Sequence, residues 1–349
     1  DLDFTLSCVS QEQGFVRPHV LLLEQDGRPE GLLVGSLRDE ELAWRLGSLP
    51  LMRSRARVVR VATGGIQGVS CAERAATVTR ELLASLERGE ADAVYLHEVE
   101  SSEPLLAEIA RQPGALQRDP CPRPISGWAL DLPASYQEFR QGLSKKTRSN
   151  LNHTANLIQR RLGAELVLAC YRKPEELERL VRDSETIACQ TYGRRAGVGF
   201  ADTPAARRML GHALARGWLR AHVLYAGARP IAFSHGLVYG KTFFGRHTGF
   251  DPAFSELRPG VFLLTRIIEE LCQERVVECM DFGVMENDFK RSFGTRRYER
   301  VSAYVFSRRW RGLRLALSRA AVGTLDRAAR SALGASRARR LARKVLGRG

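Results

Sequence analysis

The stretch GFDPAFSELRPGVFLLTRIIEELCQERVVECMDFGVMENDFKRSFG, residues 249–294, decides the fold of this chain. It predicts a strand end, a turn that contains glycine, a helix, a second strand and a segment that carries a lysine. Pro259 and Gly260 open the helical run, and proline suits the first turn of a helix. Apolar residues recur along it at Val261, Leu264, Ile267, Ile268 and Leu271.

The start of this helix is expected to bind a phosphate. The N–H groups of a first turn have no partner inside the helix and carry a partial positive charge. Arg258 adds a cation beside them, and such a turn can hold a pyrophosphate. We therefore expect Arg258, Gly260 and Val261 to bind the carrier of a phosphorylated acyl donor. An ordinary Pro-Gly helix start is the alternative.

The net charge of +15 is concentrated at the C-terminal end of the 349 residues. Thirteen Lys/Arg residues and one acidic residue follow from Arg308 onward, so this segment carries +12. The rest of the chain is nearly balanced, which argues against a nucleic-acid-binding body. A length of 349 residues favours two domains of ordinary size.

The cysteine content and the N-terminal residues indicate the cellular compartment of the protein. Seven cysteines without a C-x-x-C pair or a zinc-type histidine spacing predict a reducing compartment and no structural metal. The chain begins with an acidic segment, and nowhere do 18 apolar residues run without interruption. We expect a cytoplasmic protein.

The last 40 residues, 310–349, predict an amphipathic helix. Trp310, Leu313, Leu317 and Ala320 share one helical face. Arg311 and Arg314 are expected to lie off this face. Basic residues beside an apolar stripe with a tryptophan suit an anionic membrane surface. We therefore expect a peripheral position at the inner membrane. A solvated or packed helix, and contact with RNA phosphates, are the alternatives.

The two halves of the chain repeat one pattern. Residues 19–37 and 221–239 each predict a strand hairpin. A strand, a loop, a helix and another strand follow each hairpin, with TGGIQG (63–68) as the loop of the first half. Two such units argue for an α/β protein with mixed sheets, made by internal duplication. The predicted domains are 1–132, 133–309 and the tail, 310–349.

The second half resembles the GNAT superfamily, in particular the bacterial CelD-like acetyltransferases, which are related to the Fem-type aminoacyl transferases. The resemblance covers about residues 143–306. Its landmarks are LSKKTRSNL (143–151), TYGRR (191–195), GARPIAF (227–233), GFDP (249–252), RPG (258–260), MDFG (280–283) and FKRSFG (289–294). It implies two tandem GNAT-like units, of which the first is degraded and lacks the lysine segment.

The turn departs from the pattern of acetyl-CoA-binding members of the superfamily. Leu257 and Phe262 stand where those members have outer polar and small residues around the glycine. The resemblance therefore leaves the donor open between acyl-CoA, acyl-carrier protein and the aminoacylated end of a tRNA.

The resemblance also implies the chemistry, in which an amine attacks a thioester or ester carbonyl held between two splayed strands. Lys290 matches the lysine of the Fem-type motif and is expected to stabilise a phosphate or a developing oxyanion. Asp281 ends the preceding strand and is expected to orient Lys290 or the incoming amine. The alternatives are a solvated lysine and a helix cap.

Further candidates come from residue type and position. His235 and His247 lie on adjacent predicted strands and can accept the proton of the amine. Tyr192 can donate to the leaving thiolate or bind the acceptor, with a capped helix end as the alternative. The candidate contacts to an anionic substrate or headgroup are Arg194, Arg195, Lys145, Lys146 and Arg148. Structural histidines and a solvated charged face are the alternatives.

The sequence thus predicts an N-acyltransferase that acts on the amine of an envelope precursor, such as a sphingoid-type lipid base or a sugar, at the cytoplasmic membrane face. One alternative is a Fem-like transferase that uses aminoacyl-tRNA, for which nucleic acid is a partner. The other is a non-catalytic module that binds lipid or a protein complex.

Overall fold

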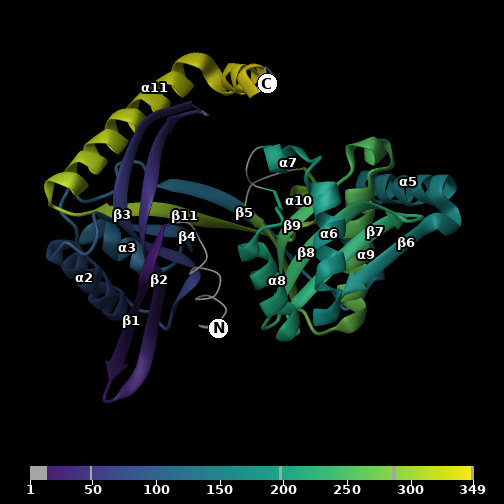
Figure 1. Ribbon diagram of the computed structural model, residues 1–349, viewed down its shortest axis with the longest axis horizontal. Helices are drawn as coiled ribbons and strands as arrows, with labels where there is room; N and C mark the ends of the chain where they lie inside the picture. The colour runs from purple at the N-terminus through teal and green to yellow at the C-terminus, as the bar shows by residue number, and fades with distance from the viewer. Residues whose placement is uncertain (1–13, 48, 196–198, 285–287, 347–349) are drawn as a thin grey trace. The chain divides into compact units, whose positions relative to one another are not determined.

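The structure is a computed structural model that describes residues 14–47, 49–195, 199–284 and 288–346 (Figure 1). Side chains are described for these residues except Ala62, Thr63, Tyr192, Arg195 and residues 332–346. The chain divides into two compact units. Unit 1 comprises Asp1–Ile125 and Glu299–Gly349, and unit 2 comprises Ser126–Tyr298.

Unit 1 has the strand order β1-β2-β3-β4-β11. The β1–β2, β2–β3 and β4–β11 pairs are antiparallel, and β3 and β4 are parallel. Its elements are β1 (Phe15–Gln25), β2 (Arg28–Leu46), β3 (Leu49–Gln67), α2 (Ala72–Arg88), β4 (Ala93–Glu100), α3 (Pro104–Arg111), β11 (Arg296–Phe306) and α11 (Trp310–Leu346).

Unit 2 has the strand order β5-β10-β9-β8-β7-β6, in which β9 and β10 are parallel and their neighbours antiparallel. Its elements are β5 (Arg123–Asp131), α4 (Tyr136–Gly142), α5 (Lys145–Leu162), η1 (Gly163–Glu165), β6 (Leu166–Tyr171), η2 (Pro174–Glu176), α6 (Leu177–Ala188), α7 (Tyr192–Arg195), α8 (Pro204–Ala215), β7 (Leu219–Ala226), β8 (Arg229–Tyr239), β9 (Thr242–Phe250), η3 (Pro252–Leu257), α9 (Pro259–Glu274), β10 (Cys279–Val284) and α10 (Asp288–Phe293).

The two units repeat one topology, which confirms the predicted α/β fold with tandem units. In each, a hairpin (β1–β2 or β7–β8) pairs with a third strand, and a helix (α2 or α9) connects this strand to a parallel neighbour. Each unit takes its next strand from the other half of the sequence. β5 follows α3 in the chain yet pairs with β10, and β11 follows α10 yet pairs with β4.

This exchange of strands places the unit boundaries elsewhere than the predicted domain bounds of 1–132, 133–309 and 310–349. Residues from Glu299 onward belong to unit 1, because Arg300–Phe306 pair with β4. The predicted loop at 63–68 also differs, because β3 continues to Gln67 and pairs there with Leu32.

Glycine determines both predicted hairpin turns. Asp26 and Gly27 have φ values of 51° and 73°, which is the left-handed pair that a two-residue hairpin loop of type I′ requires. Gly227 has φ of 60° between β7 and β8. Glycine has no Cβ and therefore adopts left-handed backbone angles at low cost. The positions of the two turns thus follow from the sequence.

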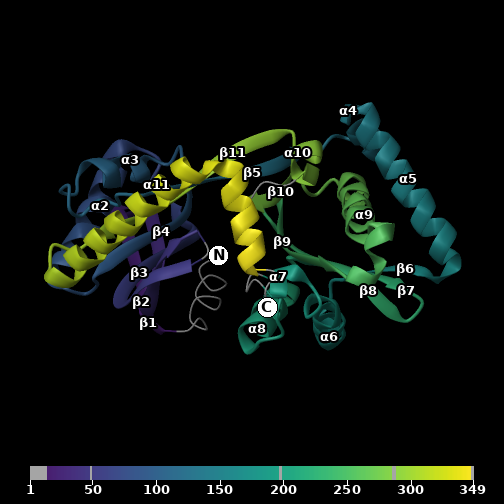
Figure 2. The same cartoon turned by 90° about the horizontal axis from the view of Figure 1, so that it is seen from above.

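Helix α9 covers one face of the sheet of unit 2, and helices α6 and α8 lie on the other face (Figure 2). Its apolar residues recur at the spacing of one helical face, and Leu263, Ile267, Ile268 and Leu271 are nearly fully buried. They pack in one core with Phe243 of β9 and Met280 of β10. The helix therefore fixes where its own N-terminus lies against the sheet.

Helix α11 packs on β2 and β3 within unit 1. Leu315, Ala316 and Val322 are buried in a core with Trp44 and its neighbours. The stripe predicted to be apolar lies on the outer side, where Trp310 and Leu317 are 65% and 61% exposed. None of the helices formed by the described residues is long and apolar enough to cross a membrane.

Candidate active site

The parallel strands β9 and β10 separate partway along their length. Their described pairing ends at Phe244 and Asp281, although β9 continues to Phe250. Asp281 Oδ1 accepts a hydrogen bond from the Gly283 amide at 2.7 Å, and Gly283 has φ of 74°. The side chain of Asp281 therefore bends the end of β10, and only glycine reaches this backbone conformation easily.

A pocket of about 240 Å³ lies at this separation. Most of its lining residues are apolar, and the polar ones are Ser234, Arg246, His247 and Thr248. The lining residues are Ser234, Phe243, Gly245, Arg246, His247, Thr248, Phe250, Gly260, Val261, Leu263, Leu264, Met280, Phe282 and Phe289. Such a mainly apolar pocket with a few polar groups is typical of a small-molecule site.

The first turn of α9 faces this pocket through Gly260 and Val261. The Val261 and Phe262 amides donate to the Arg258 carbonyl at 3.1 and 3.2 Å, and Pro259 has no N–H. The Gly260 amide is thus the donor of this turn that the described backbone does not use. Arg258 is exposed in a left-handed conformation, with φ of 50°, and is not among the lining residues.

Lys290 lies behind the end of β10 rather than at the pocket wall. Its Nζ donates to the carbonyl oxygens of Gly283 and Val284, at 3.2 and 2.8 Å. Burial lowers the pKa of the Lys290 ammonium, and the charge of Asp281 opposes this shift. Asp281 also accepts a hydrogen bond from the Tyr298 hydroxyl. Lys290 and Asp281 together hold the strand end that borders the pocket.

His235 faces the α6 side of the sheet and is not among the lining residues. It is 1% exposed, its Nε2 lies 2.9 Å from Ser184 Oγ, and Phe200 packs edge-on at 4.8 Å between ring centroids. Burial lowers its pKa to about 3, and His247 adds to the shift. This environment is that of a structural histidine.

His247 stands opposite His235 in the β8–β9 register, and its ring lies 6.1 Å from the His235 ring and 5.8 Å from the Phe200 ring between centroids. The residue is also among those that line the pocket. Burial lowers its pKa to about 4, with a smaller effect of Arg246. Its Nδ1 is buried without a hydrogen-bond partner among the described residues. At neutral pH the ring is uncharged and is a weak base.

We expect His235→Asn to flatten the dependence of stability on pH. The folded pKa of His235 is about 3, against about 6.5 in the unfolded chain. Between these values the unfolded state binds more protons, so stability falls as the pH falls below 6.5. At pH 5 this histidine accounts for about 2 kcal/mol of the loss relative to pH 7. Urea unfolding at both pH values measures it, and equal losses in wild type and variant would contradict it.

Among the other predicted contacts, Arg194, Lys145, Lys146 and Arg148 are not lining residues of the pocket. Arg194 forms an ion pair with Glu185 at 3.0 Å and donates to the Phe200 carbonyl at 2.8 Å. The side chains of Tyr192 and Arg195 lie outside the described residues. Lys145 and Lys146 are exposed at the start of α5, and Arg148 donates to the Gln141 carbonyl at 3.0 Å.

Ser234, Arg246 and Phe289 are among the lining residues that the sequence predictions did not name as site residues. Ser234 precedes His235 on β8, and successive residues of a strand point to opposite faces. The sequence does not show which of Ser234 and His235 faces the pocket. The packing of helices on the two faces of the sheet decides that it is Ser234. Arg246 is exposed at the pocket and adds a cation there.

Comparisons with known proteins agree with this geometry. Residues 145–291 match the profile of the family described as acetyltransferase (GNAT) domain. No curated protein matches the sequence.

Solved structures share the fold. FemX superposes with a TM-score of 0.59 at 11% identity, over 84% of this chain and 89% of FemX. The C-terminal domain of a putative lysylphosphatidylglycerol synthetase from Agrobacterium fabrum gives 0.54 at 13% identity, over 92% and 96%. L-PGS from Bacillus licheniformis gives 0.52 at 12% identity, over 90% and 96%.

The family profile covers the pocket, the start of α9 and the lysine segment, which are the features on which the resemblance in sequence depends. The chain therefore contains a segment, residues 145–291, that matches the acetyltransferase (GNAT) domain.

Proposed function

We propose that this enzyme transfers an acyl group from a thioester, carried by coenzyme A or acyl-carrier protein, to an amine in the pocket between β9 and β10. The observation that supports this most is the separation of these parallel strands beside the Gly260 amide. The amine nitrogen attacks the carbonyl carbon, the C–S bond breaks, and an amide and a free thiol result.

The pocket residues receive roles in this proposal. Arg246 and the Gly260 amide bind the phosphate of the carrier, because both a cation and a helix N-terminus attract anions. His247 accepts the proton of the attacking amine, because it is a pocket-lining residue that is uncharged at pH 7. Its lowered pKa makes it a weak base that does not retain the proton at pH 7. Asp281 and Lys290 act as positioning residues that hold the end of β10.

Replacing the two histidines in turn tests the assignment. We expect His247→Asn to lower kcat by about 100-fold or more, the range of general-base catalysis, and His235→Asn to lower it much less. Release of free thiol from acetyl-CoA and longer acyl-CoA, with long-chain and sugar amines as acceptors, measures the rate. Equal effects of the two replacements would contradict a proton-accepting role for His247.

An aminoacyl-tRNA donor is the second candidate, favoured by the fold shared with FemX at a TM-score of 0.59. The departure of this turn from the acetyl-CoA pattern, at Leu257 and Phe262, also suits a carrier other than coenzyme A. Amide formation from aminoacyl-tRNA that stops after ribonuclease treatment, without any thiol release from acyl thioesters, would replace the thioester proposal. A chain that binds lipid but transfers no acyl group with either donor would be a binding module.

We propose that the acceptor belongs to a lipid or another envelope precursor at the cytoplasmic membrane face. The synthetase neighbour is named for lysylphosphatidylglycerol, a lipid that carries an amino acid. On α11 the outer face presents Trp310 and Leu317 beside Arg311 and Arg314, and the Arg314 guanidinium lies 5.0 Å from the Trp310 ring centroid. Apolar and basic groups on one face suit an anionic bilayer.

We expect Trp310→Ala with Leu317→Ala to weaken binding to anionic vesicles at least about tenfold, since each large side chain gains about 1.5–3 kcal/mol on full burial. Co-sedimentation with vesicles that contain phosphatidylglycerol measures it. Val276→Ala, at a position that is 57% exposed in unit 2, is the matched control. Unchanged binding of the double variant would contradict the membrane role of this face.

A further inference from the structure

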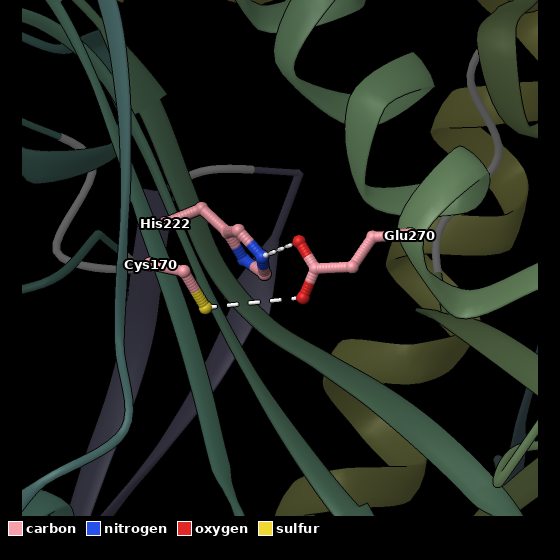
Figure 3. Close-up of side chains that lie close together, drawn as sticks. All are labelled: Cys170, His222 and Glu270. Atoms are coloured by element: carbon pink, nitrogen blue, oxygen red, sulfur yellow. Dashed lines mark hydrogen bonds and ion pairs between the residues drawn. The ribbon is translucent and has the colours of Figure 1, made fainter. Parts of the chain in front are cut away.

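A second group of reactive side chains lies in unit 2, and the proposed acyl transfer does not use it. Cys170, His222 and Glu270 each offer one ligand atom, and these atoms all lie within 4.8 Å of one another (Figure 3). His222 Nε2 is 3.0 Å from Glu270 Oε2, and Cys170 Sγ is 3.8 Å from Glu270 Oε1. From these contacts we propose that the three residues bind a zinc ion.

The fold brings the three residues together from distant parts of the sequence. Cys170 on β6 stands opposite His222 on β7 in the antiparallel register, so the two side chains leave the sheet on the same face. Glu270 belongs to α9, which covers that face, and its side chain projects toward His222 and Cys170 (Figure 3). The site thus joins the last two strands of the sheet to the helix whose first turn lines the pocket.

The ligand chemistry selects zinc. A thiolate, an imidazole and a carboxylate are the three ligand types that Zn²⁺ accepts, and three protein ligands leave its fourth position for water. Magnesium and calcium prefer oxygen ligands alone. The side chain of Glu270 is 24% exposed, so water can reach the fourth position.

The imidazole of His222 has a nitrogen available for a ligand. The residue is 1% exposed, and its Nδ1 is buried without a hydrogen-bond partner among the described residues. Buried polar atoms normally have a partner. Either ring nitrogen can ligate a metal, and Nε2 is the one that can share an ion with Glu270, because it faces that carboxylate at 3.0 Å.

One charged side chain, Arg172, lies against the three residues. Its Nε lies 3.1 Å from Cys170 Sγ, and the same guanidinium pairs with both Glu270 and Glu274. The ion pair between Arg172 and Glu274 can remain when Glu270 binds zinc. Coordination releases the protons of the thiol and the ring to solvent.

Zinc titration of the full chain, after removal of metal by a chelator, tests the proposal. We expect one ion per chain by calorimetry and a rise in Tm with zinc, because a ligand that binds only the folded state stabilises it. Co²⁺ in place of zinc should give the absorption of thiolate-to-metal charge transfer. Neither readout depends on acyl transfer, so the proposal can fail or hold independently of the proposed function.

Three replacements make the result specific. Cys170→Ser should abolish the charge-transfer band, and both Cys170→Ser and Glu270→Gln should weaken zinc binding by more than about 100-fold, because even residues that only orient a ligand cost about 10- to 100-fold. Cys189→Ser removes an exposed thiol of unit 2 and should change neither. Zinc binding that survives Cys170→Ser, or that Cys189→Ser removes, would overturn the site, as would the absence of binding to a folded wild-type chain.

Discussion

Replacing Lys290 by methionine is expected to lower kcat by about 100-fold or more and the free energy of unfolding by about 2–4 kcal/mol. The stability loss follows from two carbonyl groups, of Gly283 and Val284, that lose their donor where Lys290 is only 9% exposed. A buried polar group left without a partner costs about 1–3 kcal/mol.

The expected loss of activity arises because Lys290 positions pocket residues, not because it contacts the substrate. Lys290 holds the end of β10, and Phe282 of β10 and Phe289 of α10 both line the pocket. A shift of about 1 Å in the groups that position a substrate can cost about 100-fold in rate. We therefore expect kcat to fall more than the KM for the donor rises.

Lys290→Gln separates this role from a direct role of the charge. Glutamine is close to methionine in size and keeps an N–H donor for the carbonyls, but it has no charge. We expect it to recover a large part of both stability and kcat. If Gln and Met variants are equally inactive while the Gln variant is as stable as wild type, the ammonium acts directly on the phosphate or oxyanion. Full activity of the Met variant would remove Lys290 from the mechanism altogether.

Replacing Arg319 by alanine should destabilise unit 1 by about 3–5 kcal/mol, the usual cost of breaking a buried ion pair from one side. Arg319 on α11 and Asp119 are 6% and 3% exposed, and they join through two contacts of 2.6 and 2.7 Å. The guanidinium also donates to the Cys121 carbonyl at 2.8 Å and lies 4.8 Å from the Tyr304 ring centroid. Its loss leaves the Asp119 carboxylate buried without its cation.

Denaturant unfolding of three variants measures this effect. Arg319→Ala should show the full loss. Arg88→Ala breaks two exposed ion pairs, with Glu81 at 2.9 Å and with Glu90 at 2.8 Å, and should cost much less, because solvent screens exposed pairs. Replacing Arg319 and Asp119 together by leucine should cost less than Arg319→Ala, since no charge stays buried. A loss below about 1 kcal/mol for Arg319→Ala would mean that α11 is not anchored to unit 1.

Local patterns in the sequence predict most elements of the fold. Gly27 and Gly227 mark the hairpin turns, and the apolar spacing of 259–274 predicts α9, which the structure bears out at Pro259–Glu274. The order of elements predicts the tandem units. The exchange of β5 and β11 was missed, because local residue patterns determine a strand but not its partner, which depends on long-range pairing.

The candidate site was predicted only in part. Gly260, Val261 and His247 line the pocket, whereas Lys290, Asp281 and His235 support the elements around it. Adjacent strand residues point to opposite faces, so the choice between His235 and Ser234 requires knowledge of which helices cover each face. That knowledge comes from packing.

The sequence by itself determined the repeated α/β units and the helix that begins at Pro259, because these depend on glycine, proline and apolar periodicity within short segments. Only the tertiary structure decided which side chains meet. Cys170, His222 and Glu270 are up to 100 residues apart, and no spacing in the sequence indicates them. The 249–294 stretch likewise specifies a turn and a lysine, but the separation of β9 from β10 turns that region into a pocket, and the lysine holds its edge.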